Sequence, residues 1–292
     1  MTCFAEREFD YAALRAYEKA LLTEYSFIRK EVIGYSLLHR ELCAYTIGED
    51  NGVLITAVFH GMERVTGAVL MRYLFEKARK HKEGREYSFT AIPLMNPDGA
   101  EIALYGASSA GRYRSLVQRL SKGDTYRWQA NARGVDLNHN FNAGRVRLRE
   151  NEIKNGFILR GPTRYGGTDP ESEPEVAALC DFCRRRDFFA AAALHSQGRE
   201  IYADFEDSAP ESAALAEKMA ARSGYTYTKP TGTAVGGGFK DWFSKRFCRP
   251  GFTIEIGKGE NPLPIEVADT EYERVKATLD ILTEKASLSK GG

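Results

Sequence analysis

Residues Asn51 to Thr66 read NGVLITAVFHGMERVT, in which an apolar run ends at His60 and a carboxylate follows at Glu63. The run from Val53 to Phe59 is rich in β-branched residues, which is typical of a strand buried on both faces of a largely parallel sheet. A helical pattern begins at Glu63. Open α/β sheets bind ligands beyond the carboxyl ends of their strands, so His60 and Glu63 could hold one metal ion there. The alternative interpretation of the pair is a capped start of a helix.

Length and composition limit the kind of protein. The chain has 292 residues, of which 43% are hydrophobic, and its net charge is +1. We predict one domain over residues 1–292, with a first helix near residues 9–29 and a tail after residue 286. The net charge argues against general nucleic-acid binding, and no apolar run is long enough to span a membrane. The start MTCFAEREFDYAAL lacks the basic and apolar regions of a signal peptide, so we expect a cytoplasmic protein.

The cysteines are odd in number and scattered along the chain, at positions 3, 43, 180, 183 and 248. This pattern fits free thiols in a reducing compartment. Cys180 and Cys183 form a CxxC pair within a helical pattern. With no second pair nearby, we expect no metal or redox role for them.

The rest of the chain alternates strand and helix patterns, which indicates an α/β fold. In order, we predict a hairpin made of residues 32–46 and 53–59, a helix at 65–81, a strand at 87–94, a turn at 95–99, an irregular segment at 100–134, a helix at 174–186, a strand at 188–194, a strand at 201–205, a helix at 212–223, a glycine-rich loop at 235–238 before a further helix, a strand at 252–256 and a last helix at 271–286.

Two further residues carry possible chemistry. His195 follows the strand at 188–194, so two predicted strands end in a histidine. Glu255 lies among apolar neighbours in FTIEI. It either faces water from an edge strand or is partly buried with a raised pKa, which suits a general base.

Six motifs together resemble the carboxypeptidase-A-like zinc metallopeptidases. They are HGME from His60, NPDG from Asn96, GVDLNHNF from Gly134, SEPE from Ser172, LHSQG from Leu194 and GFTIEIG from Gly251. They occur in the order of that family, and the resemblance covers residues 32–264. The stretches HSQGREIY and GFTIEIGKGENPLP look most like the bacterial branch that cleaves γ-D-glutamyl-diamino acid bonds in peptidoglycan peptides.

The resemblance implies a three-layer α/β/α fold with a mixed, mainly parallel sheet. It also implies one zinc ion bound by His60, Glu63 and His195, and a small peptide as the substrate. In such a site the metal lowers the pKa of a bound water toward ~7. Glu255 would take the proton of that water and return it to the leaving amine.

This chain departs from the family at the substrate side. Relatives grip the terminal carboxylate with an Asn-Arg pair, whereas here Asn138 is followed by His139, and a neutral imidazole lacks the two-pronged fork of arginine. This favours a substrate with a different polar end. Gln197 is a candidate substrate-binding residue and a candidate partner of the metal ligand His195. Asp136 is expected to satisfy backbone groups.

Two other family positions are less clear in this chain. The tyrosine that relatives place over the substrate is replaced by Thr233, with Tyr225 and Tyr227 as possible substitutes. For the arginine that stabilises the oxyanion we favour Arg133. Arg127 and Gln129 are the alternatives.

Three functions therefore compete. The first is a zinc peptidase that cleaves short peptidoglycan-derived peptides beside γ-D-glutamate. The second is a carboxypeptidase for ordinary peptides, which the absence of arginine at position 139 disfavours. The third is a catalytically inactive binding module on the same fold. Because a non-catalytic protein has no physical need for Glu255, we favour an enzyme over this third alternative.

Overall fold

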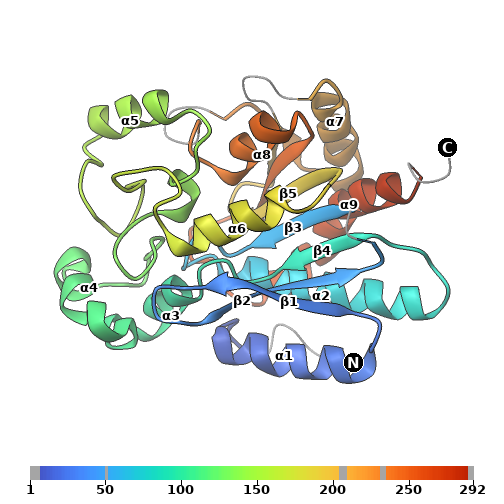
Figure 1. The fold of residues 1–292 in the computed structure, drawn as a ribbon, viewed down its shortest axis with the longest axis horizontal. Helices are drawn as coiled ribbons and strands as arrows, with labels where there is room; N and C mark the ends of the chain where they lie inside the picture. The colour runs from blue at the N-terminus through green and yellow to red at the C-terminus, as the bar shows by residue number, and fades with distance from the viewer. Residues whose placement is uncertain (1–6, 50–51, 204–208, 231–234, 289–292) are drawn as a thin grey trace.

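A twisted mixed sheet runs through the middle of the computed structural model, which describes residues 7–49, 52–203, 209–230 and 235–288 (Figure 1). Within these residues the sheet has eight strands in the order β1-β2-β4-β3-β5-β8-β6-β7. The strands are β1 (Arg29–Tyr35), β2 (Glu41–Ile47), β3 (Val53–Ala57), β4 (Phe89–Ile92), β5 (Ala190–Ser196), β6 (Glu200–Tyr202), β7 (Thr226–Tyr227) and β8 (Gly251–Ile256).

The four central strands β4, β3, β5 and β8 run parallel to one another. Their side chains alternate between two hydrophobic cores, as the period of a strand requires. Ile55 and Ala192 belong to the larger core, whereas Leu54 and Ala193 belong to the second core on the other face. Both faces are therefore buried, which confirms the prediction for the strand that precedes His60.

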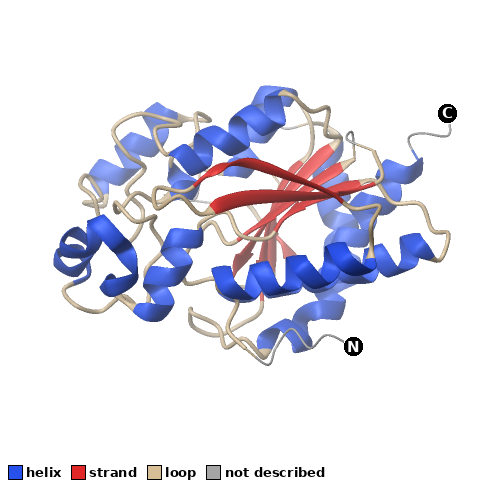
Figure 2. Cartoon of the chain, turned by 60° about the horizontal axis from the view of Figure 1, so that its bottom comes forward, coloured by secondary structure: helices blue, strands red, loops and turns tan. Residues whose placement is uncertain are grey.

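Helices cover both faces of the sheet, as Figure 2 shows. Helices α1 (Tyr11–Glu24), α2 (Arg64–Lys82), α7 (Glu211–Ser223) and α9 (Val267–Leu288) contribute to the larger core, and α6 (Pro174–Arg184) and α8 (Phe239–Phe247) contribute to the second. This arrangement confirms the three-layer α/β/α prediction. The single domain over residues 1–292 stays a prediction.

The predicted hairpin was placed one element too late. The antiparallel hairpin is formed by β1 and β2, whereas β3 pairs in parallel with β4 and β5. The chain turns at residues 36–40, where the N–H of Ser36 donates to the Arg40 carbonyl (2.9 Å) and His39 has a φ of 61°. Leu37 and Leu38 continue the apolar run through this turn, so the pattern hid it.

The segment predicted as turn and irregular chain is largely helical. Asn96 caps α3 (Pro97–Tyr105), since its Oδ1 accepts the N–H of Gly99 (2.9 Å). The 3-10 helix η1 (Ala107–Tyr113) and α4 (Arg114–Ser121) follow, and α5 (Arg145–Lys154) comes after the short η2 (Leu137–His139). These helices gather at one end of the molecule, on the left in Figure 1.

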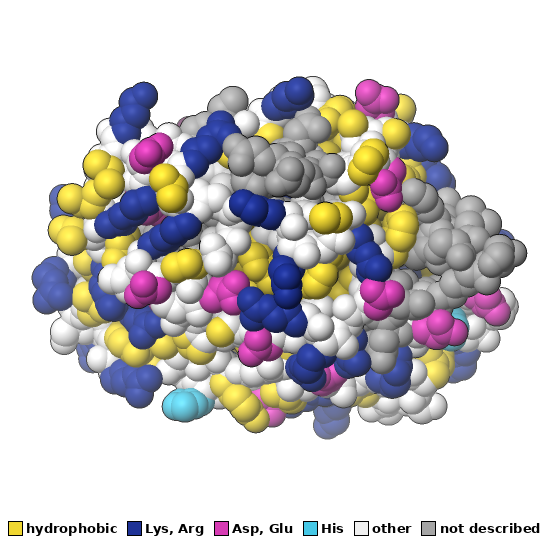
Figure 3. Space-filling view, turned by 45° about the horizontal axis from the view of Figure 1, so that its top comes forward, with side chains coloured by type: hydrophobic (Ala, Val, Ile, Leu, Met, Phe, Trp, Pro, Cys, Tyr) yellow, Lys and Arg dark blue, Asp and Glu magenta, His cyan; other side chains and the backbone are white. Residues whose placement is uncertain are grey.

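Several other features bear on the sequence predictions. Cys43, Cys180, Cys183 and Cys248 are free thiols, as expected. Strand β6 ends at Tyr202 and α9 ends at Leu288, and residues 204–208 and 289–292 lie outside the described part. On the face in Figure 3, basic and acidic side chains are interspersed. Among the described residues, no helix has both the length and the apolar character needed to cross a membrane.

Candidate metal centre and active-site cavity

Two histidines and a glutamate converge at the carboxyl ends of neighbouring strands. His60 and Glu63 lie between β3 and α2, and His195 is the penultimate residue of β5, which pairs in parallel with β3. Glu63 Oε1 lies 2.9 Å from His60 Nδ1, and Glu63 Oε2 lies 3.0 Å from His195 Nδ1. The two Nδ1 atoms are 3.3 Å apart. Parallel pairing thus brings together residues that are 132 and 135 positions apart.

The turn after β3 is tight, and Gly61 makes it possible. The N–H of Gly61 donates to the Gln129 carbonyl (3.0 Å), and a Cβ at this position would lie 2.2 Å from the Gly99 carbonyl oxygen. Phe59 stacks on the His195 ring, with 5.7 Å between centroids and 9° between planes. Packing and backbone contacts therefore hold the cluster in place.

The donor set of the cluster suits zinc. The candidate ligand atoms of His60, Glu63 and His195 all lie within 4.8 Å of one another. Imidazole nitrogen and carboxylate oxygen are common zinc ligands, and three protein ligands leave a position open, as in catalytic zinc sites. This cluster could therefore hold the metal ion.

The charges in the cluster depend on one another. Burial opposes the ionisation of Glu63, but His60 and His195 hold its pKa well below the ordinary value. Burial likewise opposes the charged form of His60, but Glu63 and Asp136 raise its pKa well above the ordinary value. The centre thus combines the negative charge of ionised carboxylates with the positive charge of a protonated histidine. A divalent cation could supply that positive charge in place of the proton.

Asp136 lies behind His60 and was missed as a functional residue. Its Oδ1 is 3.3 Å from His60 Nε2, on the side of the ring opposite Glu63. It also accepts the backbone N–H groups of Asn138 (3.1 Å) and Arg164 (2.9 Å), which agrees with the backbone role predicted from the sequence. Carboxylates in this position fix the orientation of a ligating imidazole and raise its basicity. Asp136 therefore connects the cluster to the loop that carries Asn138.

Glu255 lies beside the cluster. It faces His195 across the parallel pair of β5 and β8, and β8 lies between β5 and β6. This excludes the alternative of an edge strand. Burial, followed by the charge of Glu63, raises the pKa of Glu255 well above its ordinary value. Its side chain is partly buried and lines the cavity, and its role as general base stays a prediction.

A cavity of about 310 Å³ contains the cluster and Glu255. The predicted substrate residues Asn138, His139 and Gln197 also line it. Gln197 is exposed, and the buried His195 Nε2 has no hydrogen-bond partner among the described residues, so Gln197 does not bond to it. Thr233 lies outside the described residues. Gln129, one of the alternatives for the oxyanion residue, lines it too. The lining residues that were not predicted are Asp136, Arg164, Ser196, Tyr202, Lys240, Thr253 and Asn261.

The structure corrects the prediction for Arg133. Its guanidinium does not line the cavity and donates instead to Glu173, from Nε (2.8 Å) and Nη2 (3.0 Å). Arg127 pairs with Glu260 at the surface (2.7 Å). Of the three candidates, Gln129 lies at the cavity. Glu173, a buried carboxylate outside the cavity, therefore binds Arg133, the arginine that we favoured from the sequence.

The tyrosine substitutes also lie elsewhere. Tyr225 is buried and donates to Glu271 (2.9 Å), and Tyr227 belongs to β7. Neither lines the cavity, whereas Tyr202 on β6 does. The strand pattern gave no sign of this, because the same pattern fits a tyrosine that packs in a core and one that lines a site.

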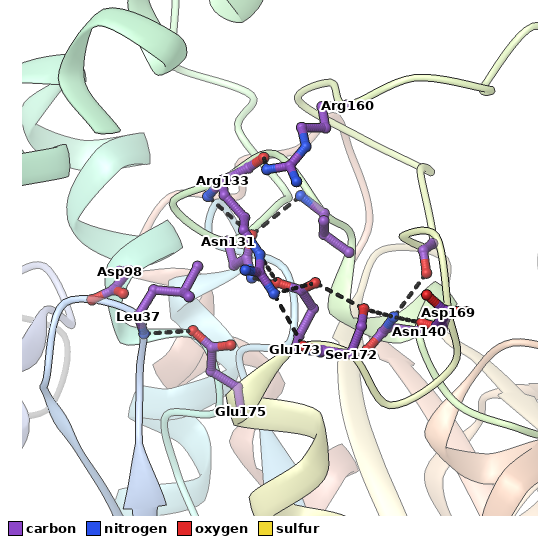
Figure 4. A network of polar contacts seen from close by, with 12 residues as sticks. Leu37, Asp98, Asn131, Arg133, Asn140, Arg160, Asp169, Ser172, Glu173 and Glu175 are labelled. Carbon is purple, nitrogen blue, oxygen red and sulfur yellow. Dashed lines mark hydrogen bonds and ion pairs between the residues drawn. The ribbon is translucent and has the colours of Figure 1, made fainter. Parts of the chain in front are cut away.

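A polar network holds the loop that forms one side of the cavity (Figure 4). We call Asn131, Arg133, Asn140, Ser172 and Glu173 the Glu173 network. Glu173 accepts from Asn131 Nδ2 (2.6 Å) as well as from Arg133, and its N–H donates to Asn140 Oδ1 (3.0 Å). The SEPE and GVDLNHNF motifs thus meet in one buried network.

A ligand cluster at the strand ends of an α/β sheet, beside a partly buried carboxyl group, defines the kind of site found in metal-dependent hydrolases. The family model for zinc carboxypeptidases matches residues 14–277. The chain belongs to this family and is a zinc metallopeptidase, a hydrolase of peptide bonds.

Individual relatives agree with this assignment. A γ-D-glutamyl-L-diamino acid endopeptidase from Lysinibacillus sphaericus is 33% identical over 286 residues, which cover 92% of this chain and 70% of that protein. Two solved structures share the fold. Bovine thrombin-activatable fibrinolysis inhibitor has a TM-score of 0.78 at 19% identity, covering 98% and 100% of the two chains. Murein-tripeptide amidase from Escherichia coli O157 has a TM-score of 0.56 at 22% sequence identity, and the match covers 86% of this chain and 90% of that chain.

Proposed function

We propose that the protein hydrolyses short peptidoglycan-derived peptides at the bond between γ-D-glutamate and a diamino acid. The observation that carries the proposal is the placement of Glu255 beside the convergent His60, Glu63 and His195 in one cavity. The 33% identity to a γ-D-glutamyl-L-diamino acid endopeptidase supports this choice of bond. A cytoplasmic location stays a prediction.

His60, Glu63 and His195 would hold one zinc ion. When bound, zinc supplies a Lewis acid that polarises the scissile carbonyl and makes a water more acidic. Asp136 fixes the His60 ring by its contact to Nε2 (3.3 Å). The packing of Phe59 fixes the His195 ring, so the ligands need little reorganisation when the metal binds.

Glu255 is the general base and then the general acid. Its carboxylate takes a proton from the attacking water, a C–O bond forms at the carbonyl carbon, and the C–N bond breaks as Glu255 gives the proton to the departing amine. Its raised pKa suits both steps, because a very weak base would accept the proton poorly.

Two amides in the cavity supply donors in place of arginine. The Gln129 side-chain oxygen accepts from Thr163, and Asn138 Oδ1 accepts the N–H of Phe239 (3.0 Å). Since both oxygens are engaged, the NH₂ groups are the donors available to a ligand. We assign Gln129 to the oxyanion and Asn138, with His139, to a carboxylate of the substrate.

The test is a mass-resolved digest with zinc-loaded protein. L-Ala-γ-D-Glu-meso-diaminopimelate and an ordinary L-peptide are compared, using the unmodified protein, Glu255→Gln and the exposed control Glu217→Gln. We expect cleavage of the γ-D-glutamyl substrate alone. Glu255→Gln should lower kcat/KM by about 10²–10⁴-fold with unchanged zinc content, because a general acid-base group contributes that much.

Other outcomes would select among the alternatives. Cleavage of the ordinary peptide alone would support a conventional carboxypeptidase. No cleavage of either peptide, with zinc bound, would support the binding module. Full activity of Glu255→Gln would refute the role of Glu255 while leaving the reaction class intact.

A further inference from the structure

An asparagine in the loop after β8 contacts both the end of β5 and the metal centre. This residue, Asn261, belongs to the stretch GKGENPLP from Gly257 to Pro264, and it lines the cavity. Its Nδ2 donates to the carbonyl of Ser196 (2.6 Å), and its Oδ1 accepts from the Ser196 hydroxyl (2.8 Å). Two hydrogen bonds to one residue at the end of β5 thus hold the plane of the amide.

These two bonds also decide which end of the amide is the nitrogen. A backbone carbonyl only accepts hydrogen bonds, so the group of Asn261 that faces it must be the NH₂ group. The same nitrogen lies 3.5 Å from Glu63 Oε1 and has a second N–H to donate. This distance is long for a hydrogen bond, but the acceptor is a carboxylate, which strengthens the interaction. Asn261 therefore offers Glu63 a donor whose position is set by the end of a strand.

The loop that carries Asn261 is anchored on both sides of this residue. Before it, the carbonyl of Gly257 accepts the N–H of Gly198 (2.9 Å), and Gly257 has a φ of 73°, which glycine adopts without strain. After it, Leu263 is buried in the larger core. A Cβ at position 257 would lie 2.6 Å from Leu263 Cδ1, so the two ends of the loop also pack against each other. The amide of Asn261 is thus part of a preorganised support.

Asn261 differs from the other partners of the Glu63 carboxylate. Those partners are the Nδ1 atoms of His60 (2.9 Å) and His195 (3.0 Å), and both histidines are candidate ligands. A ring nitrogen that binds a metal ion has lost the proton that it could donate to a carboxylate. Among the described residues, Asn261 is the donor to Glu63 that is not itself a candidate ligand, so its hydrogen bond does not compete with metal binding.

We propose that Asn261 is a positioning residue of the metal centre, which holds the carboxylate of Glu63 toward the two imidazoles and so raises the affinity for zinc. This inference rests on the ligand set of the proposed function, and it does not depend on which bond the protein cleaves. Hydrogen-bond partners of metal ligands orient those ligands, and losing one typically costs about 10–100-fold in metal affinity. The contribution of Asn261 passes through Glu63, so it should disappear when Glu63 is replaced.

The experiment is a double-mutant cycle on zinc affinity, measured by competition with a chelator. It compares the unmodified protein, Asn261→Ala, Glu63→Ala and the double variant. We expect Asn261→Ala to lower the zinc affinity by about 10–100-fold. In the Glu63→Ala background the same substitution should have little further effect, because the carboxylate that it holds is gone. Asn155→Ala, which removes an exposed amide that also donates to a backbone carbonyl, is the matched control and should leave the affinity unchanged.

The visible absorption of bound Co²⁺ gives a second reading, which reports the arrangement of the ligands and not turnover. The spectrum of cobalt-loaded Asn261→Ala should differ from that of the unmodified protein, whereas the spectrum of Asn155→Ala should not. Urea unfolding of the metal-free proteins shows whether each variant folds. If Asn261→Ala does not fold, Asn261→Ser, whose short side chain does not reach Glu63, takes its place in the same cycle.

The outcomes separate this inference from the proposed ligand set. An unchanged zinc affinity and cobalt spectrum in Asn261→Ala would overturn the inference, while a loss of zinc affinity in Glu63→Ala would still support the ligand set. Equal losses from Asn261→Ala in the presence and absence of Glu63 would also overturn it, because the effect would not pass through this carboxylate. If Glu63→Ala binds zinc as tightly as the unmodified protein, the ligand set fails and the inference fails with it.

Discussion

The two walls of the cavity are held by different kinds of contact. On the first wall, His195 and Glu255 lie at the ends of paired parallel strands, where backbone hydrogen bonds and apolar packing fix their positions. On the second wall, Asn138 and His139 belong to the short 3-10 helix η2, and the segment around it depends on Asp136 and on the Glu173 network. Backbone hydrogen bonds, which hold the first wall, tolerate most side-chain changes. The side-chain contacts that hold the second wall do not.

This difference has a functional consequence. The groups that carry the chemistry must keep their geometry within a fraction of an ångström, and strands supply that rigidity. The groups that choose the substrate lie on loops, where one replacement such as arginine by histidine at position 139 changes recognition without touching the sheet. Substitutions in the network should therefore affect the second wall more than the first.

The largest expected effect on stability is that of Glu173→Gln. The substitution removes the buried charge that holds Arg133 (2.8 Å), and we expect the free energy of unfolding to fall by about 3 kcal/mol, because Arg133 is left without its partner but is partly hydrated. Urea unfolding of the metal-free protein measures this loss.

The control for this experiment is Glu150→Gln, an exposed residue of α5. Zinc affinity of the folded variant should equal that of the unmodified protein, because the strand ends do not depend on Glu173. A parallel loss of zinc affinity would show that the two walls are not independent.

Asp136→Asn tests the contact that joins the two walls. The amide cannot supply the negative charge beside His60 Nε2 (3.3 Å), so zinc affinity should fall by about 10–100-fold, as for other partners of ligating histidines. Competition with a chelator measures the affinity. Asp124→Asn, which also changes an acceptor of a backbone N–H, is the control. An unchanged zinc affinity would show that Asp136 only accepts backbone N–H groups and does not support His60 as a ligand.

The first wall could be predicted from the sequence because its signals are local. An apolar run that ends in His60, another that ends in His195, and a carboxylate within FTIEI each predict a strand and a residue at or near its end. The parallel arrangement of an α/β fold then brings these ends to one edge. The order of the motifs and the pattern of strands and helices both predicted an α/β fold, so the fold could be predicted as well.

The second wall could not be predicted, because its contacts join distant side chains. Nothing near Arg133 in the sequence indicates that Glu173, forty positions later, holds its guanidinium. Lys240 is one of many lysines in the chain, and only the packing of α8 on β8 places it at the cavity. The hairpin error has a related cause, since Leu37 and Leu38 continue the apolar pattern through a turn.

The smallest expected effect concerns Glu175, which lies where α6 meets the turn between β1 and β2 (Figure 4). Burial, with the nearby carboxylates of Asp98 and Glu173, raises the pKa of Glu175 from 4.5 to about 8. The folded protein therefore keeps a proton here that the unfolded chain loses above its ordinary pKa. This contribution to stability is complete below pH 4.5 and is lost as the pH rises through about 8.

Between pH 6 and pH 7 the unfolding free energy of the unmodified protein should thus fall by about 1.4 kcal/mol relative to Glu175→Gln, whose amide does not titrate. Urea unfolding of both proteins at the two pH values measures the change, and the exposed Glu217→Gln should show none. A difference between Glu175→Gln and the unmodified protein that stays constant over this interval would mean that Glu175 is ionised in the folded state. The buried carboxylates around the second wall would then be stabilised by their donors alone.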